Sequence, residues 1–261
     1  MANNILLNTQ TTDFSAPWNK EKIPLVLIHG LGAHLEMWFP QVPDFSRYFP
    51  VITVDLPGCG KSPDTGNPFT IEEMAENIHF TLNHHGIKRC YILGISLGGF
   101  VALEYAVRYS EEVNKVIFAS TPYGFPEEMI PQLQEMVKSY QGLSTREIAE
   151  SRINKAFGSL VSPEMKQYLI DHIAETNHSV YMRMASAPLF YPSKEKFAQI
   201  KQPALIITGK MDYLATVNDA ETIKNVIPGS QIAVLNNTGH ASSMENPDEF
   251  NHAVLKFILS K

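Results

Sequence analysis

The stretch Ile92-Leu-Gly94-Ile-Ser96-Leu-Gly98-Gly-Phe100 decides the fold of this chain. An apolar run, which predicts a β-strand, leads into a Gly-x-Ser-x-Gly pattern. Small residues after the pattern, among them Ala102 and Ala106, predict a closely packed helix. A sharp strand-to-helix turn strains its central residue and needs small neighbours so that it can pass close to adjacent backbone. The sequence therefore predicts an exposed Ser96 hydroxyl at the N-terminus of a helix.

A catalytic role for Ser96 needs two partners, because a serine hydroxyl is a weak nucleophile near neutral pH. It requires a base, usually histidine, and an acid that orients the base. After such a serine turn, the acid precedes the histidine in the chain. Asp212 follows the apolar run 204–208, and His240 follows the apolar run 231–235. Since ligand chemistry gathers at the carboxyl ends of parallel strands, we expect Ser96, Asp212 and His240 to form a catalytic triad.

Taken singly, Asp212 is typical of a turn and His240 of a surface loop, so the prediction depends on their joint order and placement. Other titratable residues fit these roles less well. His84 and His85 end an amphipathic helical pattern, and Asp219 belongs to the helix that follows Asp212. His172 and His178 fall in a segment without strands.

Acyl transfer also needs hydrogen-bond donors for the oxyanion of its tetrahedral intermediate. The backbone N–H of Leu97, beside Ser96 at the helix start, is the first candidate. The second is expected in the loop after an earlier strand, where His29-Gly30-Leu31-Gly32 provides glycines for close approach. We assign Leu31 N–H to this position. His29 is interpreted as a residue that braces the loop.

Short apolar runs recur along the chain and lack the alternation of a half-exposed strand. They are Leu25-Val-Leu-Ile28, Val51-Ile-Thr-Val54, Cys90-Tyr-Ile-Leu93, Lys115-Val-Ile-Phe-Ala119, Ala204-Leu-Ile-Ile-Thr208 and Gln231-Ile-Ala-Val-Leu235. Such runs are typical of strands buried on both faces, as in a parallel sheet covered by helices. Apolar residues recur at helical spacing over 71–82, and Thr70 with Glu73 fits a capping box at the start of that helix. A second helix is predicted over 247–258, with Asn246 as its N-cap. The fold class is α/β, with a mostly parallel, doubly wound sheet.

Between the runs ending at Ala119 and starting at Ala204, helical patterns replace the strands. We expect residues 122–198 to form a helical cap inserted into a core made of residues 1–121 and 199–261. Core packing is one interpretation of the cap's soft and aromatic residues, and an adaptable pocket wall is the other. These residues are Met129, Met136, Met165, Met182, Met184, Phe157, Tyr168, Tyr181, Phe190 and Tyr191.

Several function classes are disfavoured by composition. A net charge of −6 argues against nucleic acid as a partner. The sequence shows no signal-peptide pattern and no apolar window long enough for a membrane span, so we expect a cytoplasmic protein. Cys59 and Cys90 are interpreted as packing thiols.

Cofactor motifs are also incomplete. Gly58-Cys-Gly60-Lys-Ser62 resembles the end of a phosphate-binding loop, but Asp55 stands where that loop requires glycine. Pro63 breaks the dinucleotide pattern, and the histidine spacing of common zinc enzymes is absent. We expect no organic cofactor and no metal, and the sequence carries no signal for an oligomeric state.

The chain resembles α/β-hydrolase-fold enzymes of the small, capped esterase and lactonase branch, including carboxylesterases and 3-oxoadipate enol-lactonases. The resemblance spans residues 25–260 and rests on five motifs. They are His29-Gly30-Leu31-Gly32, Asp55-Leu-Pro-Gly58-Cys-Gly60-Lys-Ser62, Gly94-Ile-Ser96-Leu-Gly98-Gly99, Gly209-Lys-Met-Asp212, and Gly239-His240 followed by Glu245-Asn-Pro247. It implies the same triad and the same two oxyanion donors.

The expected function is hydrolysis of carboxylic esters with small or medium-sized, mainly apolar acyl groups, through an acyl-enzyme. Two alternatives remain open. One is an enol-lactonase or other lactone hydrolase that uses the same triad. The other is a hydrolase-fold ligand sensor with slow turnover. In each case the expected partner is a small-molecule ester or lactone.

Overall fold

The computed structural model describes residues 4–16, 22–156 and 161–260 of the 261-residue chain. A seven-stranded sheet in the order β1-β3-β2-β4-β5-β6-β7 forms its centre. Only β1 pairs antiparallel, with β3; the other described pairings are parallel. The strands are β1 (Thr9–Thr12), β2 (Leu25–Ile28), β3 (Val51–Val54), β4 (Cys90–Ile95), β5 (Val113–Ala119), β6 (Ala204–Gly209) and β7 (Gln231–Leu235). The predicted α/β fold class is confirmed, and each of the six apolar runs contributes a strand.

Strand β1 is absent from the sequence prediction. Its residues Thr-Gln-Thr-Thr are all polar, and they carry no apolar signal. They form a strand because β3 offers a free edge, where pairing needs backbone groups but no buried side chains. The strand conformation of residues 9–12 therefore depends on pairing with β3 and not on their own side chains.

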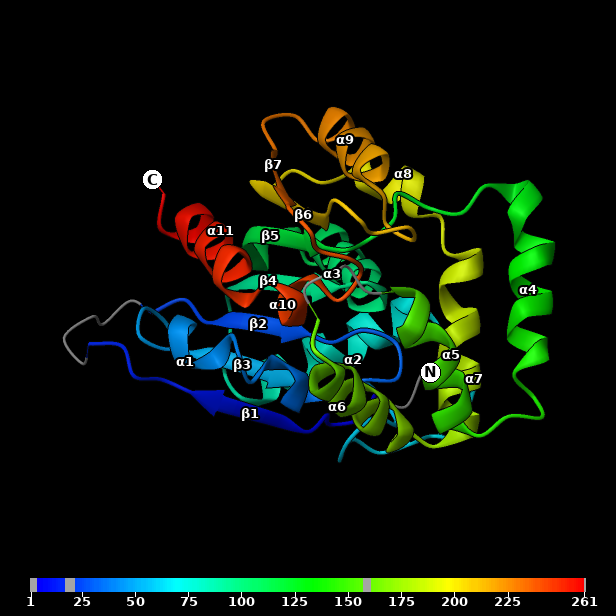
Figure 1. The fold of residues 1–261 in the computed structure, drawn as a ribbon. Helices are drawn as coiled ribbons and strands as arrows, with labels where there is room; N and C mark the ends of the chain where they lie inside the picture. The colour runs from blue at the N-terminus through cyan, green and yellow to red at the C-terminus, as the bar shows by residue number, and fades with distance from the viewer. Residues whose placement is uncertain (1–3, 17–21, 157–160, 261) are drawn as a thin grey trace.

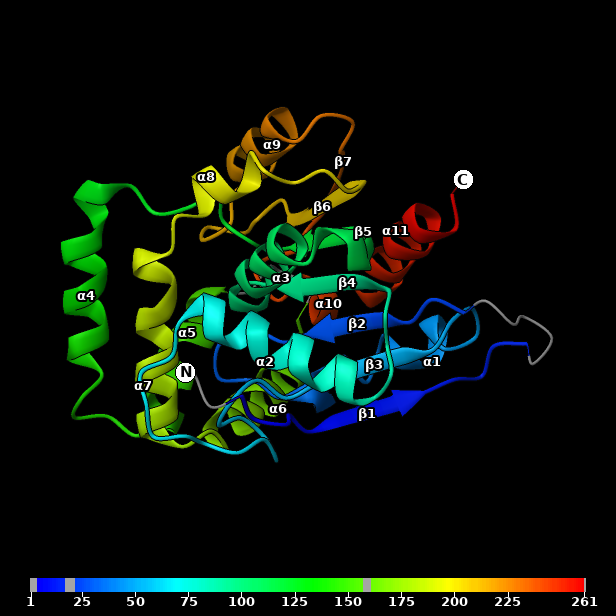
Figure 2. The same cartoon turned by 180° about the vertical axis from the view of Figure 1, so that it is seen from behind.

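Helices cover both faces of the sheet (Figures 1 and 2). On one face lie α2 (Ile71–His84), α3 (Leu97–Arg108) and α9 (Val217–Val226), and on the other lie α1 (Val42–Phe45), α10 (Ser242–Glu245) and α11 (Pro247–Leu259). Alternate strand residues serve the two layers: Val26 packs in the first cluster, and Leu27 packs in the second. Burial on both faces explains why the runs of β2, β3, β4, β5 and β6 are apolar without alternation. Strand β7 lies at the edge of the sheet and departs from this expectation, because Leu235 is the one buried residue of its five.

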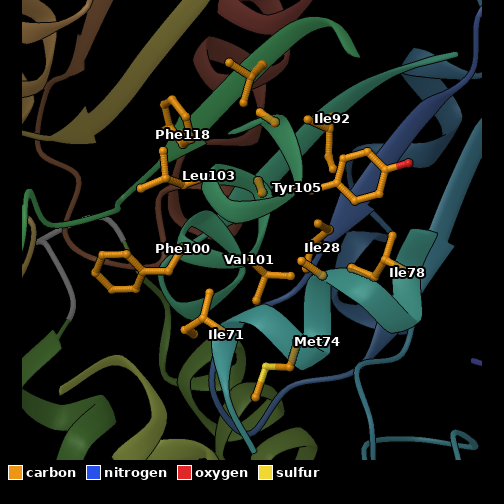
Figure 3. Packing of buried hydrophobic residues seen from close by; sticks show 14 of the residues in the cluster. Ile28, Ile71, Met74, Ile78, Ile92, Phe100, Val101, Leu103, Tyr105 and Phe118 are labelled. Carbon is orange, nitrogen blue, oxygen red and sulfur yellow. The ribbon is translucent and has the colours of Figure 1, made fainter. Parts of the chain in front are cut away.

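The layer against α2 and α3 anchors the serine turn. Figure 3 shows Ile71, Met74 and Ile78 of α2, spaced as predicted, together with side chains of α3 and of the strands. Thr70 starts α2 by accepting a hydrogen bond from Glu73 N at 3.1 Å. In α3, every residue from Leu97 to Ala106 is buried. A helix enclosed in this way holds its N-terminus rigidly against the sheet.

Helices fill the segment between β5 and β6. They are α4 (Ile130–Ser139), α5 (Thr145–Ala156), α6 (Pro163–Ala174), α7 (His178–Ser186) and α8 (Ser193–Phe197), and a 3₁₀ turn at Ala187–Phe190 lies between α7 and α8. Helices α4, α5 and α7 lie beyond the carboxyl ends of the parallel strands (Figure 1). Helix α8 returns to the core, where Phe197 stacks edge-on against Phe118 at 5.2 Å between ring centroids. We retain the division into a core and a cap at residues 122–198 as a proposal, and we refer to this segment as the insertion.

Two further expectations concern the two cysteines and the membrane. Cys59 and Cys90 are free and buried, and burial raises the pKa of each thiol to about 12. They are therefore packing residues and not reactive thiolates. Within the described ranges, no helix combines the length and the apolar character needed to cross a bilayer.

Candidate active site

Ser96 occupies a strained turn between β4 and α3. Its φ of 54° and ψ of −117° lie in a region that costs a non-glycine residue about 1–3 kcal/mol. The surrounding backbone holds this geometry, since Ser96 N donates to Ala119 O and Ser96 O accepts from Gly99 N, both at 2.9 Å. The strain directs the hydroxyl away from the helix it precedes. The local sequence thus produces the turn that its Gly-x-Ser-x-Gly pattern predicts.

Gly94 and Gly98 are needed at this turn for space. A Cβ on Gly94 would overlap the Gly98 carbonyl, and a Cβ on Gly98 would overlap the carbonyls of Ile28 and His29. Because these obstacles are backbone atoms, they cannot move aside as a side chain can. The two glycines therefore bring the start of α3 directly against the loop that follows β2.

Three side chains from the carboxyl ends of three strands meet at Ser96. His240 Nε2 lies 2.9 Å from Ser96 Oγ, and His240 Nδ1 lies 2.9 Å from Asp212 Oδ2 and 3.1 Å from Oδ1. A carboxylate only accepts hydrogen bonds, so it favours the tautomer with the proton on Nδ1. Nε2 is then free to accept the Ser96 hydroxyl proton. This arrangement is chemically able to activate a serine.

Asp212 and His240 are both held by backbone amides. Asp212 is buried, and its Oδ1 accepts from Leu214 N and Ala215 N at 2.9 Å each. The carboxylate of Glu245 accepts from Gly239 N at 2.8 Å and from Ala241 N at 2.9 Å, which are the residues on either side of His240. Glu245 belongs to a motif that carries the family resemblance, but the sequence alone indicates no role for it. Its position five residues after the histidine, just before the Asn-Pro start of α11, is the available signal.

The two residues named as oxyanion donors lie beside Ser96. Leu97 is the first residue of α3, where the backbone N–H has no intrahelical acceptor. A Cβ on Gly30 would lie 3.5 Å from Ser96 Cβ, which shows how closely the Gly30-Leu31 loop approaches the serine. Leu31 lines the same cavity as Ser96 and His240.

His29 braces this loop, as its sequence position suggests. Its Nε2 accepts from Leu56 N at 2.9 Å, so Nδ1 carries the proton and donates to Gly30 O at 2.8 Å. Burial lowers the pKa of His29 to about 4, which keeps the ring neutral.

Backbone N–H groups at the glycine-rich turn after β3 donate to a carboxylate of the chain itself. Asp55 Oδ2 accepts from Lys61 N at 2.9 Å, and Asp55 Oδ1 accepts from Leu35 N at 2.7 Å. In a phosphate-binding loop, amides of this kind would face the ligand. Here a carboxylate of the chain itself occupies that place.

The weaker candidates have structural partners. Asp219 accepts from Thr216 N at 2.9 Å and caps α9. His178 contacts Tyr140 O at 3.2 Å. His172 does line the cavity, but its Nε2 accepts from His34 N at 3.2 Å, and burial lowers its pKa to about 3.

A cavity of about 110 Å³ adjoins Ser96 and His240. Its walls are mainly apolar and come from both the core and the insertion: Leu31, Ala33, Met37, Leu214, Ile153, Leu169, Ile173 and Tyr181. A larger groove of about 630 Å³ between α4, α7 and residues 68–70 contains none of the three catalytic candidates. The small cavity is therefore the space available to the reacting part of a substrate.

The insertion contributes to the cavity through residues other than most of those expected. Among the methionines and aromatics of the insertion that the structure describes, Tyr181 is the one that lines the cavity. Met129 and Met136 are exposed, and Met184 is packed in the core beside Cys59. Met182, Phe190 and Tyr191 line the larger groove, Met165 packs in a small cluster with Ile153, and Phe157 lies outside the described residues. Of the two interpretations of these residues, core packing fits Met184 and Met165, and the pocket wall fits Tyr181, while branched aliphatic residues provide most of that wall.

Arg152 lines the cavity from α5 and was missed by sequence analysis. The available signal is its spacing, since it lies three and four residues after the fully buried Ala149 and Ile148. A charged residue on the buried stripe of an amphipathic helix is unusual and calls for a partner.

Comparison with known proteins identifies a family and several relatives of this chain. A sequence model described as alpha/beta hydrolase fold matches residues 23–247. The 3-oxoadipate enol-lactonase 2 of Acinetobacter baylyi is 30% identical over 233 residues, covering 88% of this chain and 86% of that protein. A 2-hydroxy-6-oxononadienedioate/2-hydroxy-6-oxononatrienedioate hydrolase of Paraburkholderia phymatum is 28% identical, with 91% and 87% coverage.

Solved structures show the same fold at lower identity. The enol-lactonase from Burkholderia xenovorans superposes with a TM-score of 0.88 at 23% identity, covering 99% of this chain and 98% of the other. A thermophilic esterase from Thermogutta terrifontis, with malate bound, gives 0.83 at 24% identity, with 97% and 92% coverage. Both cover the insertion as well as the core.

Proposed function

The chain belongs to the alpha/beta hydrolase fold family, and from this premise we propose that it is a serine hydrolase acting on carboxylic esters of small or medium-sized, mainly apolar acyl groups. The observation that carries the proposal is the continuous hydrogen-bonded chain Ser96 Oγ, His240, Asp212 at the mouth of an apolar cavity. Relatives named as lactonase and hydrolase support the class of reaction.

In the first half-reaction, Ser96 Oγ forms a bond to the carbonyl carbon while its proton passes to His240 Nε2. The backbone N–H groups of Leu31 and Leu97 donate to the oxyanion of the tetrahedral intermediate. The bond to the leaving oxygen then breaks, and His240 gives the proton to that oxygen. An alcohol leaves, and the acyl group remains on Ser96.

In the second half-reaction, water attacks the acyl carbon and its proton passes to His240 Nε2. The new tetrahedral intermediate collapses, the bond to Ser96 breaks, and His240 returns the proton to Ser96 Oγ. A carboxylic acid is released. Asp212 stays ionised throughout and stabilises the imidazolium of His240 in both steps.

Replacing the nucleophile tests the proposal. Ser96→Ala should lower kcat/KM for p-nitrophenyl acetate by about 10³-fold or more, because attack and acyl transfer both need Oγ. A fluorophosphonate should add one mass label to the wild-type protein and none to the variant. Ser186→Ala, at the end of α7 and away from the cavity, is the matched control and should behave as wild type.

A Ser96→Ala variant with wild-type turnover would overturn the assignment. Repeated turnover by the wild type also separates the enzyme from a ligand sensor, which would release one burst of product per molecule.

Lactone hydrolysis is the second candidate, and the 30% identical relative named 3-oxoadipate enol-lactonase 2 favours it. Ring opening uses the same attack, except that the leaving oxygen stays attached to the acyl group. Titration of acid released from γ-lactones, δ-lactones and enol-lactones, with Ser96→Ala as the control, distinguishes the two preferences.

We further propose that the enzyme acts in the cytoplasm on a small-molecule substrate and that residues 122–198 form its cap. The buried free thiols fit a reducing compartment. The nucleophile, the base and the orienting acid all come from the chain, so the proposed steps need no metal and no organic cofactor.

A further inference from the structure

Arg152 is placed where the substrate of the proposed reaction must lie. It projects from α5 into the cavity that Ser96 and His240 also line, and it is partly buried. Its guanidinium lies near the phenol groups of Tyr181, Tyr140 and Tyr213. The cation is therefore surrounded by aromatic side chains and phenol oxygens at the edge of an apolar space.

The charge of Arg152 has no acidic counterpart in the described ranges. Arg146, six residues earlier on α5, pairs with Asp171 at 2.7 Å, and Arg183 of α7 pairs with Asp64 at 2.6 Å, whereas no ion pair among the described residues includes Arg152. Burial raises the pKa of Tyr181, so its phenol is neutral near pH 7. Removing a cation from water without an anion is costly. A ligand that brings a negative charge would relieve this cost.

We propose that Arg152 determines specificity by binding a carboxylate on the substrate, so that the preferred substrate is a short ester or lactone whose acyl chain ends in a free carboxylate. This inference rests on the proposed function and narrows its substrate class: the acyl chain stays apolar along its length, and its far end carries one negative charge. Arg152 recognises the far end of the acyl group, while Ser96 reacts with the near end. The aliphatic walls contact the methylene groups between them.

The shape of the site favours a short dicarboxylic half-ester. A guanidinium presents a planar fork that pairs with the two oxygens of a carboxylate. The cavity is small, at about 110 Å³, and mainly apolar side chains line it between Ser96 and Arg152, which favours a short acyl chain. The ring of Tyr181 packs against Gly32, where a Cβ would lie 2.7 Å from Cε2. Tyr181, one of the phenols near Arg152, is thereby fixed to the loop that carries Leu31.

The test compares two methyl esters of equal length, monomethyl glutarate and methyl pentanoate, whose five-carbon acyl groups end in a carboxylate and a methyl group. Acid release by the full-length enzyme is followed by titration. Arg152→Met should lower the ratio of kcat/KM for glutarate to that for pentanoate by about 10- to 100-fold, since a charge-assisted hydrogen-bonded pair is lost. Arg152→Lys, which keeps the charge without the fork, should give an intermediate ratio. Arg146→Met on the same helix is the matched control and should keep the wild-type ratio.

A thermal melt accompanies each variant. A folded Arg152→Met protein whose ratio stays within twofold of wild type overturns the inference and leaves the proposed function intact. Should Arg152→Met fail to fold, Arg152→Lys decides: a ratio lowered severalfold supports the inference, and an unchanged ratio overturns it.

A binding measurement separates the inference from the proposed function. Glutarate is titrated calorimetrically into Ser96→Ala protein with and without Arg152→Met. Binding that weakens at least tenfold on loss of Arg152 supports the inference even if neither ester is hydrolysed, a result that would overturn the serine hydrolase alone. Equal binding by both proteins, or no binding to the protein that retains Arg152, overturns the inference.

Discussion

The Asp212 carboxylate has three hydrogen-bond donors, and they determine how it holds His240. Leu214 N and Ala215 N donate to Oδ1, and the Nδ1 of His240 is nearest to Oδ2. The side chain is thus locked by its own loop, which makes it an orienting group for the imidazole. In the proposed mechanism, its contribution is to the tautomer and the charge of His240.

Asp212→Asn should lower kcat about 10²- to 10⁴-fold with a much smaller change in KM. The amide can donate to Nδ1, which favours the tautomer with the proton on Nε2, where it cannot accept from Ser96. Steady-state kinetics on p-nitrophenyl acetate measure the effect. Asp219→Asn, which alters a helix cap, is the control. A kcat within threefold of wild type in folded Asp212→Asn would contradict the assigned role.

At this scale, sequence predicts residues whose role is encoded locally. Ser96 lies in its own five-residue pattern, and Asp212 and His240 each follow an apolar strand. Arg152 and Glu245 escape prediction because their roles depend on contacts made only after folding. For Arg152 the partner is the cavity, and for Glu245 it is the pair of amides around His240.

Helix α3 is closely confined by the elements around it. Its start is pressed against β2 and β4 at Gly94 and Gly98, and its residues from Leu97 to Ala106 are buried. A helix with one exposed face could shift to absorb a larger residue, but this one has no such face. The strain at Ser96 is maintained by this packing.

Gly98→Ala should therefore lower the free energy of unfolding by about 1–3 kcal/mol or more, because the new Cβ meets two backbone carbonyls. Urea unfolding measures the loss. Gly142→Ala is the matched control: no atom lies within 4 Å of its Cβ position, so its stability should hold or rise by about 0.4–1 kcal/mol. Equal stability of Gly98→Ala and wild type would refute the close approach.

Elements with an apolar signature are predictable, and those without one are not. The six apolar strands and the stripes of α2 and α11 follow from residue spacing. Strand β1 does not, because four polar residues become a strand only beside β3. The helices of the insertion are expected as a class, yet which of their residues face the cavity depends on how α5, α6 and α7 dock.

At the scale of the whole molecule, two buried imidazoles couple folding to pH. His29 and His172 have pKa values of about 4 and about 3, lowered by burial, against about 6.5 when unfolded. Below pH 6.5 the unfolded chain therefore binds more protons than the folded one. The contribution of these two groups to the free energy of unfolding is therefore complete above pH 6.5. It falls as the pH drops toward 4, by up to about 1.4 kcal/mol per pH unit for each group.

His172→Gln should make the free energy of unfolding less dependent on pH, by up to about 1.4 kcal/mol per pH unit. The reason is that glutamine can accept from His34 N without titrating. Urea unfolding at pH 7, 6, 5 and 4.5 gives the slope. The exposed His84, changed to Gln, is the control and should leave the slope unchanged. If both variants follow the wild-type curve, His172 is not protected from protonation in the folded state.

The insertion leaves the sheet after β5 and returns at β6, and these two strands are parallel neighbours with Val116 opposite Ala204. In genetic terms, the codons for 122–198 form one uninterrupted block between the codon for Ser96 and those for Asp212 and His240. Recombination confined to that block would exchange Arg152, with the other wall residues of α5, α6 and α7, and would leave the bond-breaking residues on the parental sheet. With the roles proposed for Arg152 and the triad, such an exchange would alter substrate choice without altering the reaction type, while the wall residues Leu31, Met37 and Leu214 would remain with the core.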